Sequence, residues 1–442
     1  MPRPKRLDFK GTEPKGALLV WARGVVIGPF VAALDEMRRI DPRKFRIATQ
    51  GTSREINRRI VLNLVRAHQP ISRADLARVM GVRRGAVSLI VNDLLRERLV
   101  FEGATGETVR GRKPTFLYVE SRRRCVVAVD IRASQTYLMV ADLLAKPIGG
   151  VVGMGTVQDP KAMVPVLARR IKALLAEHRD AGTCEGIGVV VPGMVEHSTM
   201  RVIHAPTLGW RNVDLRDALA AATGLPVQIE NSGRACALAQ LWAMHDDHTA
   251  PGDLAFVTVS DGLGVGVIVQ GEVLRGRNNI AGEFGHVTLA LDGPRCSCGA
   301  TGCWESFVSN RATLARYFGR PAESGGPVPS EQRSFTIEDL LARARGGDAK
   351  AMAAVQATAR YLGLGLANLI NVLDPARVYI GGEITQAWDL IEPTMRAALA
   401  ERALTAGAAA TTIRPVSASE YPRLQGAAAI VTAPAFAAPV VA

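Results

Sequence analysis

The stretch that decides the fold is AGEFGHVTLALDGPRCSCGATGCWE, residues 281–305. It holds three of the six cysteines, Cys296, Cys298 and Cys303, and His286 lies ten positions before the first of them. Thiolate and imidazole are ligands that tetrahedral zinc prefers, and three cysteines with one histidine leave no position for water. The stretch therefore predicts a closed, structural zinc site with His286, Cys296, Cys298 and Cys303 as its ligands.

Two other interpretations of these cysteines stay open on the residues alone. The pattern CxC followed by a third cysteine lacks the commoner CxxC spacing, so a loop with reduced thiols or a disulfide would also fit. Tight turns favour the metal, because a short chain that wraps around one ion needs them. The turn-forming residues are Gly293, Pro294, Gly299 and Gly302.

Length and hydropathy indicate an α/β protein without a membrane helix. A chain of 442 residues has room for two or three domains and a large core. The strongest apolar segment, residues 18–34, contains Arg23 and Pro29, and it falls short of the about 20 apolar residues that a span needs. No signal peptide with a small-residue cleavage site is evident. We therefore expect a cytoplasmic protein, in which clustered cysteines bind metal more often than they cross-link.

Positive charge is concentrated in the N-terminal part of the chain. Residues 1–124 carry 27 Lys and Arg against 12 Asp and Glu, whereas residues 125–442 carry 27 against 29. This asymmetry predicts that the N-terminal part faces a polyanion. Residues 1–50 form a basic extension for which an extra helix, a disordered arm or a start codon placed too far upstream would each fit, and we assign it no function.

Residues 51–120 show the pattern of a winged helix-turn-helix. A first helix ends before Pro70, and Ser72 with Asp75 predicts a capping box for a second helix that ends at Gly81. A third helix follows, and a β-hairpin begins near Leu99 and forms a wing. The apolar residues expected to face the core are Ile56, Ile60, Leu62, Leu64 and Val65 of the first helix and Val87, Ile90, Val91, Leu94 and Leu95 of the third.

The same segment is expected to bind double-stranded DNA. Basic residues on the first turns of the third helix lie where a recognition helix meets base edges and phosphates. The basic Gly/Pro sequence RGRKP at residues 110–114 resembles arms that enter A·T-rich minor grooves. The alternative is a small helical bundle without a nucleic-acid role. The candidate DNA contacts are Arg73, Arg83, Arg84, Ser88, Arg110, Arg112 and Lys113.

Beyond a junction at residues 121–124, strands alternate with helices. The runs CVVAVDI, TYLMVADLL and GGVVGMGTV predict three successive strands, and GIGVVVPGMV and PVQIEN predict further buried strands. LAFVTVSDGLGVGVIVQGEVL predicts two strands around a glycine-rich turn. This order favours an α/β domain of two lobes over residues 121–442.

From about residue 53 to its end the chain resembles the ROK family of repressors, open reading frames and sugar kinases. AGEFGH followed by CSCGATGCWE matches the family's E-x-G-H and C-x-C-G-x-x-G-C-x-E signature, and VPGMVE, HAPTLGW and IGGE match weaker blocks. The resemblance implies an actin-like, ribonuclease-H-type fold of two lobes, a structural zinc and a sugar pocket in the interlobe cleft. Transcriptional members carry an N-terminal winged helix, as here, and kinase members lack it.

The residues that phosphoryl transfer needs are altered. Family kinases place a catalytic Asp after Asn, whereas here Ser232 follows Asn231, and a serine hydroxyl cannot serve as that base. The kinase motif D-x-G-G-T-K is replaced by the residues from Asp130 to Gln135. In the second phosphate loop Asp261 would put a negative charge beside a phosphate. We expect a pseudokinase without enzymatic activity.

The pocket keeps other family residues. The resemblance implies sugar contacts from Asn231, Glu283, His286 and Glu305, with His286 also binding zinc through its second ring nitrogen. Structural hydrogen bonding around the zinc loop is the alternative role for the two glutamates. Thr207 stands where Asn is usual in the HAP-x-L-GW block.

The hypothesis that fits these observations is a transcriptional regulator in the form of a repressor. Its partners would be a DNA operator and a carbohydrate or sugar-phosphate effector, and a homodimer or dimer of dimers would place two winged helices on successive major-groove turns. A sugar kinase with residual activity is the alternative function. A DNA-binding protein without a ligand is a third interpretation.

Overall fold

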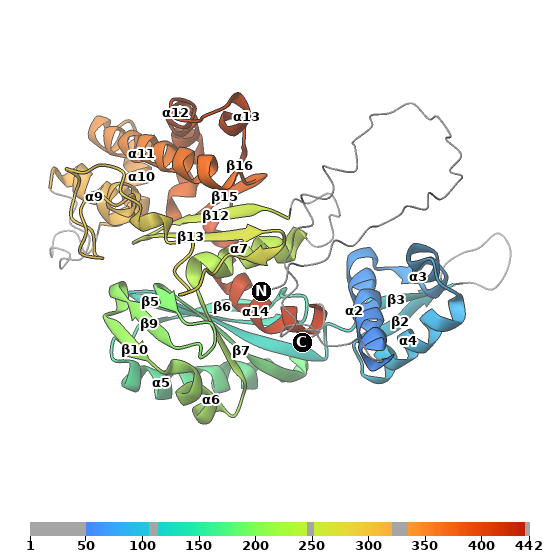
Figure 1. The fold of residues 1–442 in the computed structure, drawn as a ribbon. Coiled ribbons are helices and arrows are strands. Elements are labelled where there is room, and N and C mark those ends of the chain that lie inside the picture. Colours follow the sequence, from blue (N-terminus) through green and yellow to red (C-terminus); the bar gives the residue numbers. More distant parts are fainter. Residues whose placement is uncertain (1–49, 106–113, 245–251, 321–334, 438–442) are drawn as a thin grey trace, which may run out of the picture. The chain divides into compact units, whose positions relative to one another are not determined.

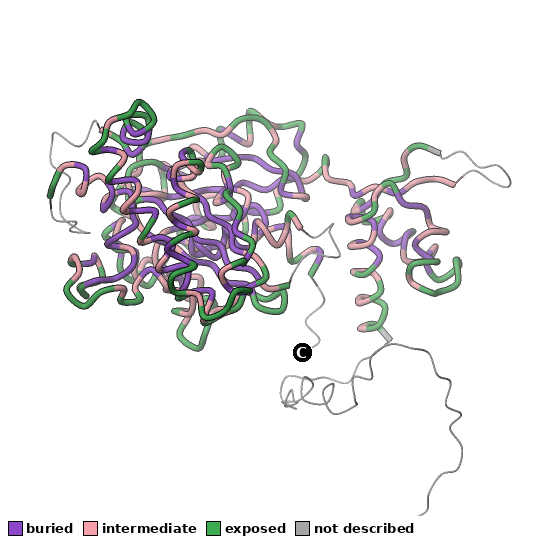
Figure 2. The backbone as a smooth tube through the Cα atoms, turned by 90° about the horizontal axis from the view of Figure 1, so that it is seen from above, coloured by how far each residue is buried: buried purple, intermediate pink, exposed green. Residues whose placement is uncertain are grey.

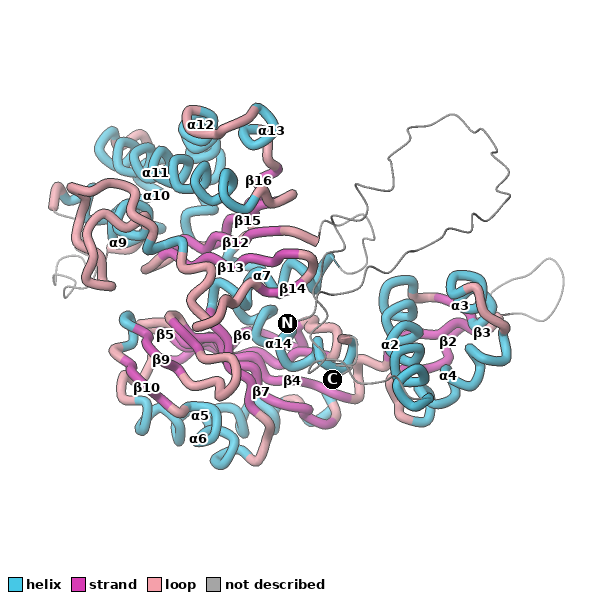
Figure 3. The backbone as a smooth tube through the Cα atoms, viewed as in Figure 1, coloured by secondary structure: helices cyan, strands magenta, loops and turns pink. Residues whose placement is uncertain are grey.

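The computed structural model describes residues 50–105, 114–244, 252–320 and 335–437 (Figures 1 and 3). Apart from the first three residues of α2, the features below belong to one compact unit, Ser53–Pro439, in which a winged helix precedes two α/β lobes. The domain boundaries at residues 50 and 120 stay a prediction.

The winged helix is built as its sequence predicts. Ser72 caps the second helix and forms a capping box with Asp75, and Gly81 ends that helix in the left-handed conformation at φ 65°. The wing strands pair in the order β1-β3-β2. The wing tip at residues 106–113 lies outside the described residues. The elements are α2 (Gln50–His68), β1 (Ile71–Ser72), α3 (Arg73–Met80), α4 (Arg84–Arg96), β2 (Val100–Thr105) and β3 (Thr115–Val119).

One residue of α2 that was expected to face the core, Ile60, does not do so. Ile60 is 42% exposed, whereas Val61, Leu62 and Val65 are buried. Successive residues on a helix are about 100° apart, so a run of three cannot all face the core; here Val61 and Leu62 face it and Ile60 does not. The prediction for Ile60 was wrong because a run of consecutive apolar residues does not specify which of them faces inward.

The first lobe contains a five-stranded sheet in the order β11-β7-β4-β5-β6. Strands β4, β5 and β6 are antiparallel neighbours, while β7 and β11 run parallel to β4. A small sheet in the order β10-β9-β8 adjoins it. The elements are β4 (Arg124–Ile131), β5 (Gln135–Asp142), β6 (Pro147–Gly155), α5 (Pro160–Glu177), η1 (Arg179–Ala181), β7 (Thr183–Val191), β8 (Met194–Val195), β9 (Val202–Ala205), η2 (Pro206–Leu208), β10 (Trp210–Val213), α6 (Leu215–Thr223), β11 (Val227–Asn231) and α7 (Ser232–Ala243).

Both faces of this sheet are covered, which explains its continuous apolar strands. In β4, Val127 and Val129 pack in a cluster with residues of α5 and α6, whereas Val126 and Ala128 pack with residues of α14 (Pro422–Phe436). In Figure 2 the buried segments, in purple, run through the interior, with exposed segments in green around them. Alternation along β4 therefore separates two apolar layers instead of a core and a solvent face.

The second lobe repeats this topology in the order β14-β13-β12-β15-β16. Its sheet packs on one face against α10, α11 and α12 and on the other against α7. None of the described helices is long and apolar enough to cross a bilayer. The elements are β12 (Leu254–Val259), β13 (Leu263–Val269), β14 (Glu272–Val273), η4 (Phe284–His286), α8 (Glu305–Val308), α9 (Asn310–Phe318), α10 (Ile337–Arg345), α11 (Ala349–Leu373), β15 (Arg377–Gly381), η6 (Glu383–Ala387), α12 (Trp388–Ala400), α13 (Ala406–Ala409), β16 (Thr412–Pro415), η7 (Ala418–Glu420) and α14.

Candidate effector pocket, metal site and DNA-binding surface

The four predicted metal ligands come together in one cluster. Their ligand atoms all lie within 4.8 Å of one another, with Cys298 Sγ 3.7 Å from Cys303 Sγ and Cys296 Sγ 3.6 Å from His286 Nδ1. Zinc–sulfur bonds of about 2.3 Å in a tetrahedron put two sulfurs about 3.8 Å apart. The donor set and its spacing therefore fit one tetrahedral zinc ion.

Tight backbone turns hold this cluster. Gly302 has φ 73°, and a Cβ at this position would lie 1.6 Å from the carbonyl oxygen of Ala290. Thr288 pairs with Cys303, and Arg295 pairs with Thr301, as isolated β-bridges. Only glycine fits at position 302, which brings Cys303 next to the chain that follows His286.

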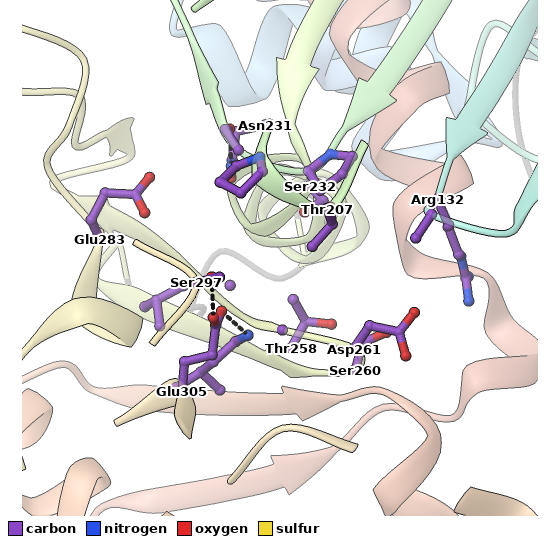
Figure 4. Close-up of a pocket in the computed structure, with 18 of the residues that line it drawn as sticks. Arg132, Thr207, Asn231, Ser232, Thr258, Ser260, Asp261, Glu283, Ser297 and Glu305 are labelled. Atoms are coloured by element: carbon purple, nitrogen blue, oxygen red, sulfur yellow. Dashed lines mark hydrogen bonds between the residues drawn. The ribbon is translucent and has the colours of Figure 1, made fainter. Parts of the chain in front are cut away.

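A small cavity of about 110 Å³, open to solvent, lies next to this cluster (Figure 4). All four predicted sugar contacts line it: Asn231, Glu283, His286 and Glu305. Figure 4 shows Asn231 and Ser232 on one wall, with Thr258, Ser260, Asp261 and Glu305 on the opposite wall. The structure therefore brings together residues from both lobes.

Glu305 connects the metal loop to the glycine-rich turn between β12 and β13. Its Oε2 accepts a hydrogen bond from the backbone N–H of Leu263 at 2.9 Å, and its Oε1 accepts one from Ser297 Oγ at 3.2 Å. Cys296 Sγ lies 3.7 Å from the same Oε1. Glu305 thus positions the metal loop while its carboxylate also lines the cavity.

Asn231 has a structural role that the sequence did not reveal. Its side-chain oxygen caps α7 by accepting from the N–H groups of Gly233 and Arg234, at 2.8 and 3.1 Å. Its Nδ2 donates to the carbonyl oxygen of Gly193 at 2.6 Å. The amide is therefore fixed by the backbone. Because both lone pairs of Oδ1 are used, the second N–H of Nδ2 is the group that remains for a ligand.

The two ring nitrogens of His286 face different groups. His286 Nδ1 faces Cys296, and His286 Nε2 lies 3.9 Å from Glu283 Oε2. Burial raises the pKa of the Glu283 carboxyl, and the neighbouring His286 opposes that shift. One ring nitrogen is thus available to a metal and the other faces the pocket.

The residues that the family resemblance aligns with the kinase motifs include an ionic cluster. Ser232 is buried at the first position of α7. Arg132 Nε donates to Asp130 Oδ2 at 2.7 Å, and Arg132 Nη1 donates to Glu383 Oε1 at 3.3 Å. Burial and the Glu383 charge raise the pKa of Asp261, which lies at the mouth of the cavity.

Sequence reasoning missed several residues that line the cavity. Arg423 comes from the start of α14, almost 200 positions after Ser232, so no local pattern connects them. The buried hydroxyl of Thr207 has no hydrogen-bond partner among the described residues. Its place in the HAPTLGW block was the available signal. An unsatisfied hydroxyl in a cavity wall is suited to a ligand hydroxyl.

The predicted DNA surface of α4 is open. Arg83, Arg84 and Leu89 are exposed, Leu89 to 69%, and Ser88 is half-buried. An exposed leucine beside two arginines is suited to contact a thymine methyl group, a role that the sequence did not suggest. Three further predicted contacts, Arg110, Arg112 and Lys113, lie outside the described residues.

Arg73 is engaged within the winged helix. It donates to Asn92 Oδ1 at 2.9 Å and to Glu102 Oε1 at 2.8 Å. These bonds join α3, α4 and β2, so Arg73 has a structural role in addition to the predicted DNA contact. Its DNA contact stays a prediction.

A winged helix followed by two lobes around a sugar-kinase-like pocket defines a class of DNA-binding regulators with a kinase-like sensory domain. The model of the ROK family matches residues 148–433, and the chain belongs to this family. It is similar to the putative xylose repressor of Caldicellulosiruptor sp. (strain Rt8B.4), with 31% identity over 79% of this chain and 88% of that protein.

Two solved structures are also similar to this chain. A ROK family transcriptional regulator, a homologue of the Escherichia coli MLC protein, superposes with a TM-score of 0.72 and 25% identity over 88% of this chain and 98% of its own. A ROK family glucokinase from Streptomyces griseus, in complex with glucose and AMPPNP, gives a TM-score of 0.59 and 25% identity over 69% of this chain and 98% of its own. The regulator covers more of this chain than the kinase does.

Proposed function

We propose that this chain is a transcriptional repressor whose kinase-like domain senses a neutral monosaccharide and does not phosphorylate it. One observation carries the proposal: a winged helix with the exposed basic residues Arg83 and Arg84 is joined to a pocket lined by Ser232, the residue that the family resemblance aligns with the catalytic base. A DNA-binding module joined to a binding pocket without its base is suited to regulation.

The charge of the pocket favours a neutral sugar over a sugar phosphate. Its cationic residues, Arg132 and Arg423, face the three carboxylates of Asp261, Glu283 and Glu305 in the cavity wall. Arg132 is already bound to Asp130. A phosphate dianion there would meet uncompensated negative charge, whereas sugar hydroxyls can donate to carboxylates. D-xylose is the first candidate, by similarity to the xylose repressor.

The metal site supports the pocket in this proposal. His286, Cys296, Cys298 and Cys303 would hold zinc, which supplies a fixed cross-link within the loop. The chain itself then orients the carboxylate of Glu305 through Leu263 N–H and Ser297 Oγ. The zinc loop thus has a structural role next to the ligand.

A binding screen tests this proposal. D-xylose, D-glucose and their phosphates are added to the purified chain, and sugars that raise the melting temperature are carried into a DNA-binding assay. The DNA is a duplex that the protein itself selects from a randomised pool. We expect a neutral sugar to raise the melting temperature and to change the Kd for this duplex. Stabilisation by sugar phosphates alone contradicts the neutral-ligand proposal, and failure to select any duplex contradicts the repressor.

A further inference from the structure

Two helices run from the pocket to the winged helix. α7 starts at the pocket residues Asn231 and Ser232, and α14 starts next to the pocket residue Arg423. They have 12 and 15 residues, or lengths of about 18 and 22 Å. Figure 1 shows both helices between the two five-stranded sheets. Their C-terminal ends contact α2 of the winged helix.

α2 provides donors for the last carbonyl groups of both helices. Arg66 Nη2 donates to the carbonyl oxygen of Trp242 at 2.8 Å, near the end of α7. Asn63 Nδ2 donates to that of Phe436 at 2.6 Å, at the end of α14, and Arg59 Nη1 donates to that of Ala437 at 3.0 Å. The last carbonyls of a helix lack intrahelical partners and carry partial negative charge. Positions 59, 63 and 66 share one face of α2, so this face binds both helix ends.

Arg66 lies against side chains of both helices. Its guanidinium is 3.4 Å from the centre of the Trp242 ring and 5.2 Å from that of Phe436, and the two rings meet edge to face at 5.4 Å. Arg66 is 7% exposed. A buried guanidinium placed over two aromatic rings depends on the separation of those rings. Its position therefore depends on how α7 and α14 lie relative to each other.

The two helices belong to different lobes. A Cβ on Gly188 of the first lobe's β7 would lie 1.8 Å from the carbonyl oxygen of Ala427 in α14. A Cβ on Gly266 of the second lobe's β13 would lie 2.1 Å from the carbonyl oxygen of Gly233 in α7. Backbone contacts this close attach each helix to its own sheet. The two helices also touch each other, since a Cβ on Gly426 of α14 would lie 2.1 Å from the carbonyl oxygen of Ala235 in α7. A change in the angle between the lobes therefore acts on this α7–α14 contact.

We propose that Arg66 couples the pocket to the winged helix by responding to a shift between α7 and α14. The inference rests on the proposed function, because it requires a ligand that changes the lobe angle. Sugar binding displaces Trp242 relative to Phe436, and the altered position of Arg66 moves α2. Since α2 belongs to the core of the winged helix, its movement changes DNA affinity.

The test compares variants of the full chain. Arg66→Lys keeps the charge and loses the planar fork, and Asn63→Ala removes one bond to the end of α14. Arg54→Ala is the matched control, since Arg54 lies on α2 and binds Asp93 within the winged helix. For each protein the Kd for the selected duplex is measured with and without D-xylose, or the sugar that proved active. Allosteric ratios are typically about 5- to 150-fold.

We expect Arg66→Lys and Asn63→Ala to bring this ratio toward 1, with sugar affinity unchanged and Arg54→Ala like the wild type. A ratio equal to that of the wild type in both variants overturns the coupling role of this contact. If no sugar changes the Kd of the wild type for the duplex, the proposed function fails. Hydrogen exchange then tests separately whether Arg66 stabilises the end of α14. Equal protection of the backbone amides of residues 431–437 in the wild type and Arg66→Lys would then overturn it.

Discussion

Arg132, directly after β4, donates a hydrogen bond to Glu383 of η6 across 3.3 Å, and so joins the first lobe to the second. The same guanidinium binds the buried Asp130, and Glu383 also accepts from Asn310 Nδ2 at 2.9 Å. The family resemblance aligns Asp130 and Arg132 with a phosphate-binding motif of the kinases. These ion pairs therefore support the proposal that the pocket does not bind a nucleotide phosphate.

A first prediction follows for Ser232→Asp. Restoring the carboxylate at this position does not produce a kinase, because the Arg132 cluster and Asp261 still disfavour the binding of a nucleoside triphosphate. A coupled assay with ATP and a panel of hexoses and pentoses measures this. We expect no turnover above background from the wild type or the variant, although one general base alone contributes about 10²–10⁴-fold. Turnover by the wild type would contradict the pseudokinase.

A second prediction concerns the metal. Elemental analysis is expected to find about one zinc per chain, and a strong chelator is expected to lower the melting temperature, because a structural zinc site contributes directly to folding stability. Cys303→Ser should abolish the bound zinc. Cys184→Ser is the control, since Cys184 is a half-buried cysteine outside the cluster. A metal-free protein that melts at the same temperature would exclude a structural zinc.

Sequence patterns predicted well those features of this chain that depend on residues close together in the sequence. The capping box of Ser72 and Asp75 formed as expected, because both partners are local. The loop residues from His286 to Cys303 came together because a fixed spacing and obligatory glycines brought them there. In both cases the interacting residues lie within 20 positions of each other.

Long-range relationships could not be predicted in this way. Nothing near Arg132 indicates that its partner is Glu383, about 250 positions away, and nothing near Arg66 indicates Trp242 and Phe436. Such contacts arise from how the two sheets pack, and side-chain type alone does not encode that packing. Asn231 was predicted as a sugar contact, but its capping of α7 requires knowing that the helix begins at Ser232.

A third prediction is a pH-dependent gain of stability in Asp261→Asn. Burial, and then repulsion by Glu383, raise the pKa of Asp261 above its ordinary value of 3.8. An acid with a raised pKa holds its proton more strongly in the folded state, so its ionisation lowers stability as pH rises through the shifted range. Asp261→Asn should therefore melt at a higher temperature than the wild type at pH 7. The gain is modest, because Asp261 is desolvated by the cavity walls but keeps an exposed surface, and solvent screens the effect.

This gain should disappear as the pH falls below about 3.8, where Asp261 is protonated in both the folded and unfolded states. Asp217→Asn serves as a control of opposite sign. A hydrogen bond from Arg216 lowers the pKa of Asp217, so its removal should give no gain at pH 7. Thermal unfolding across this pH range measures both. If both variants gain the same stability at pH 7, the cause is the general loss of a negative charge and not the electrostatics of the pocket.

The last prediction concerns the DNA-binding surface of α4. Arg83→Ala combined with Arg84→Ala should weaken binding to the selected duplex, by about 1–3 kcal/mol for each arginine that contacts a base edge. An arginine that contacts only phosphate should instead reduce the salt slope by about 1. The control is Arg169→Ala combined with Lys172→Ala, which removes the same charge from exposed positions of α5. Gel shifts over a salt series separate the two effects, because log K falls linearly with log salt in proportion to the phosphate contacts. If the α4 and α5 double variants lose affinity equally, net charge and not the recognition helix determines binding.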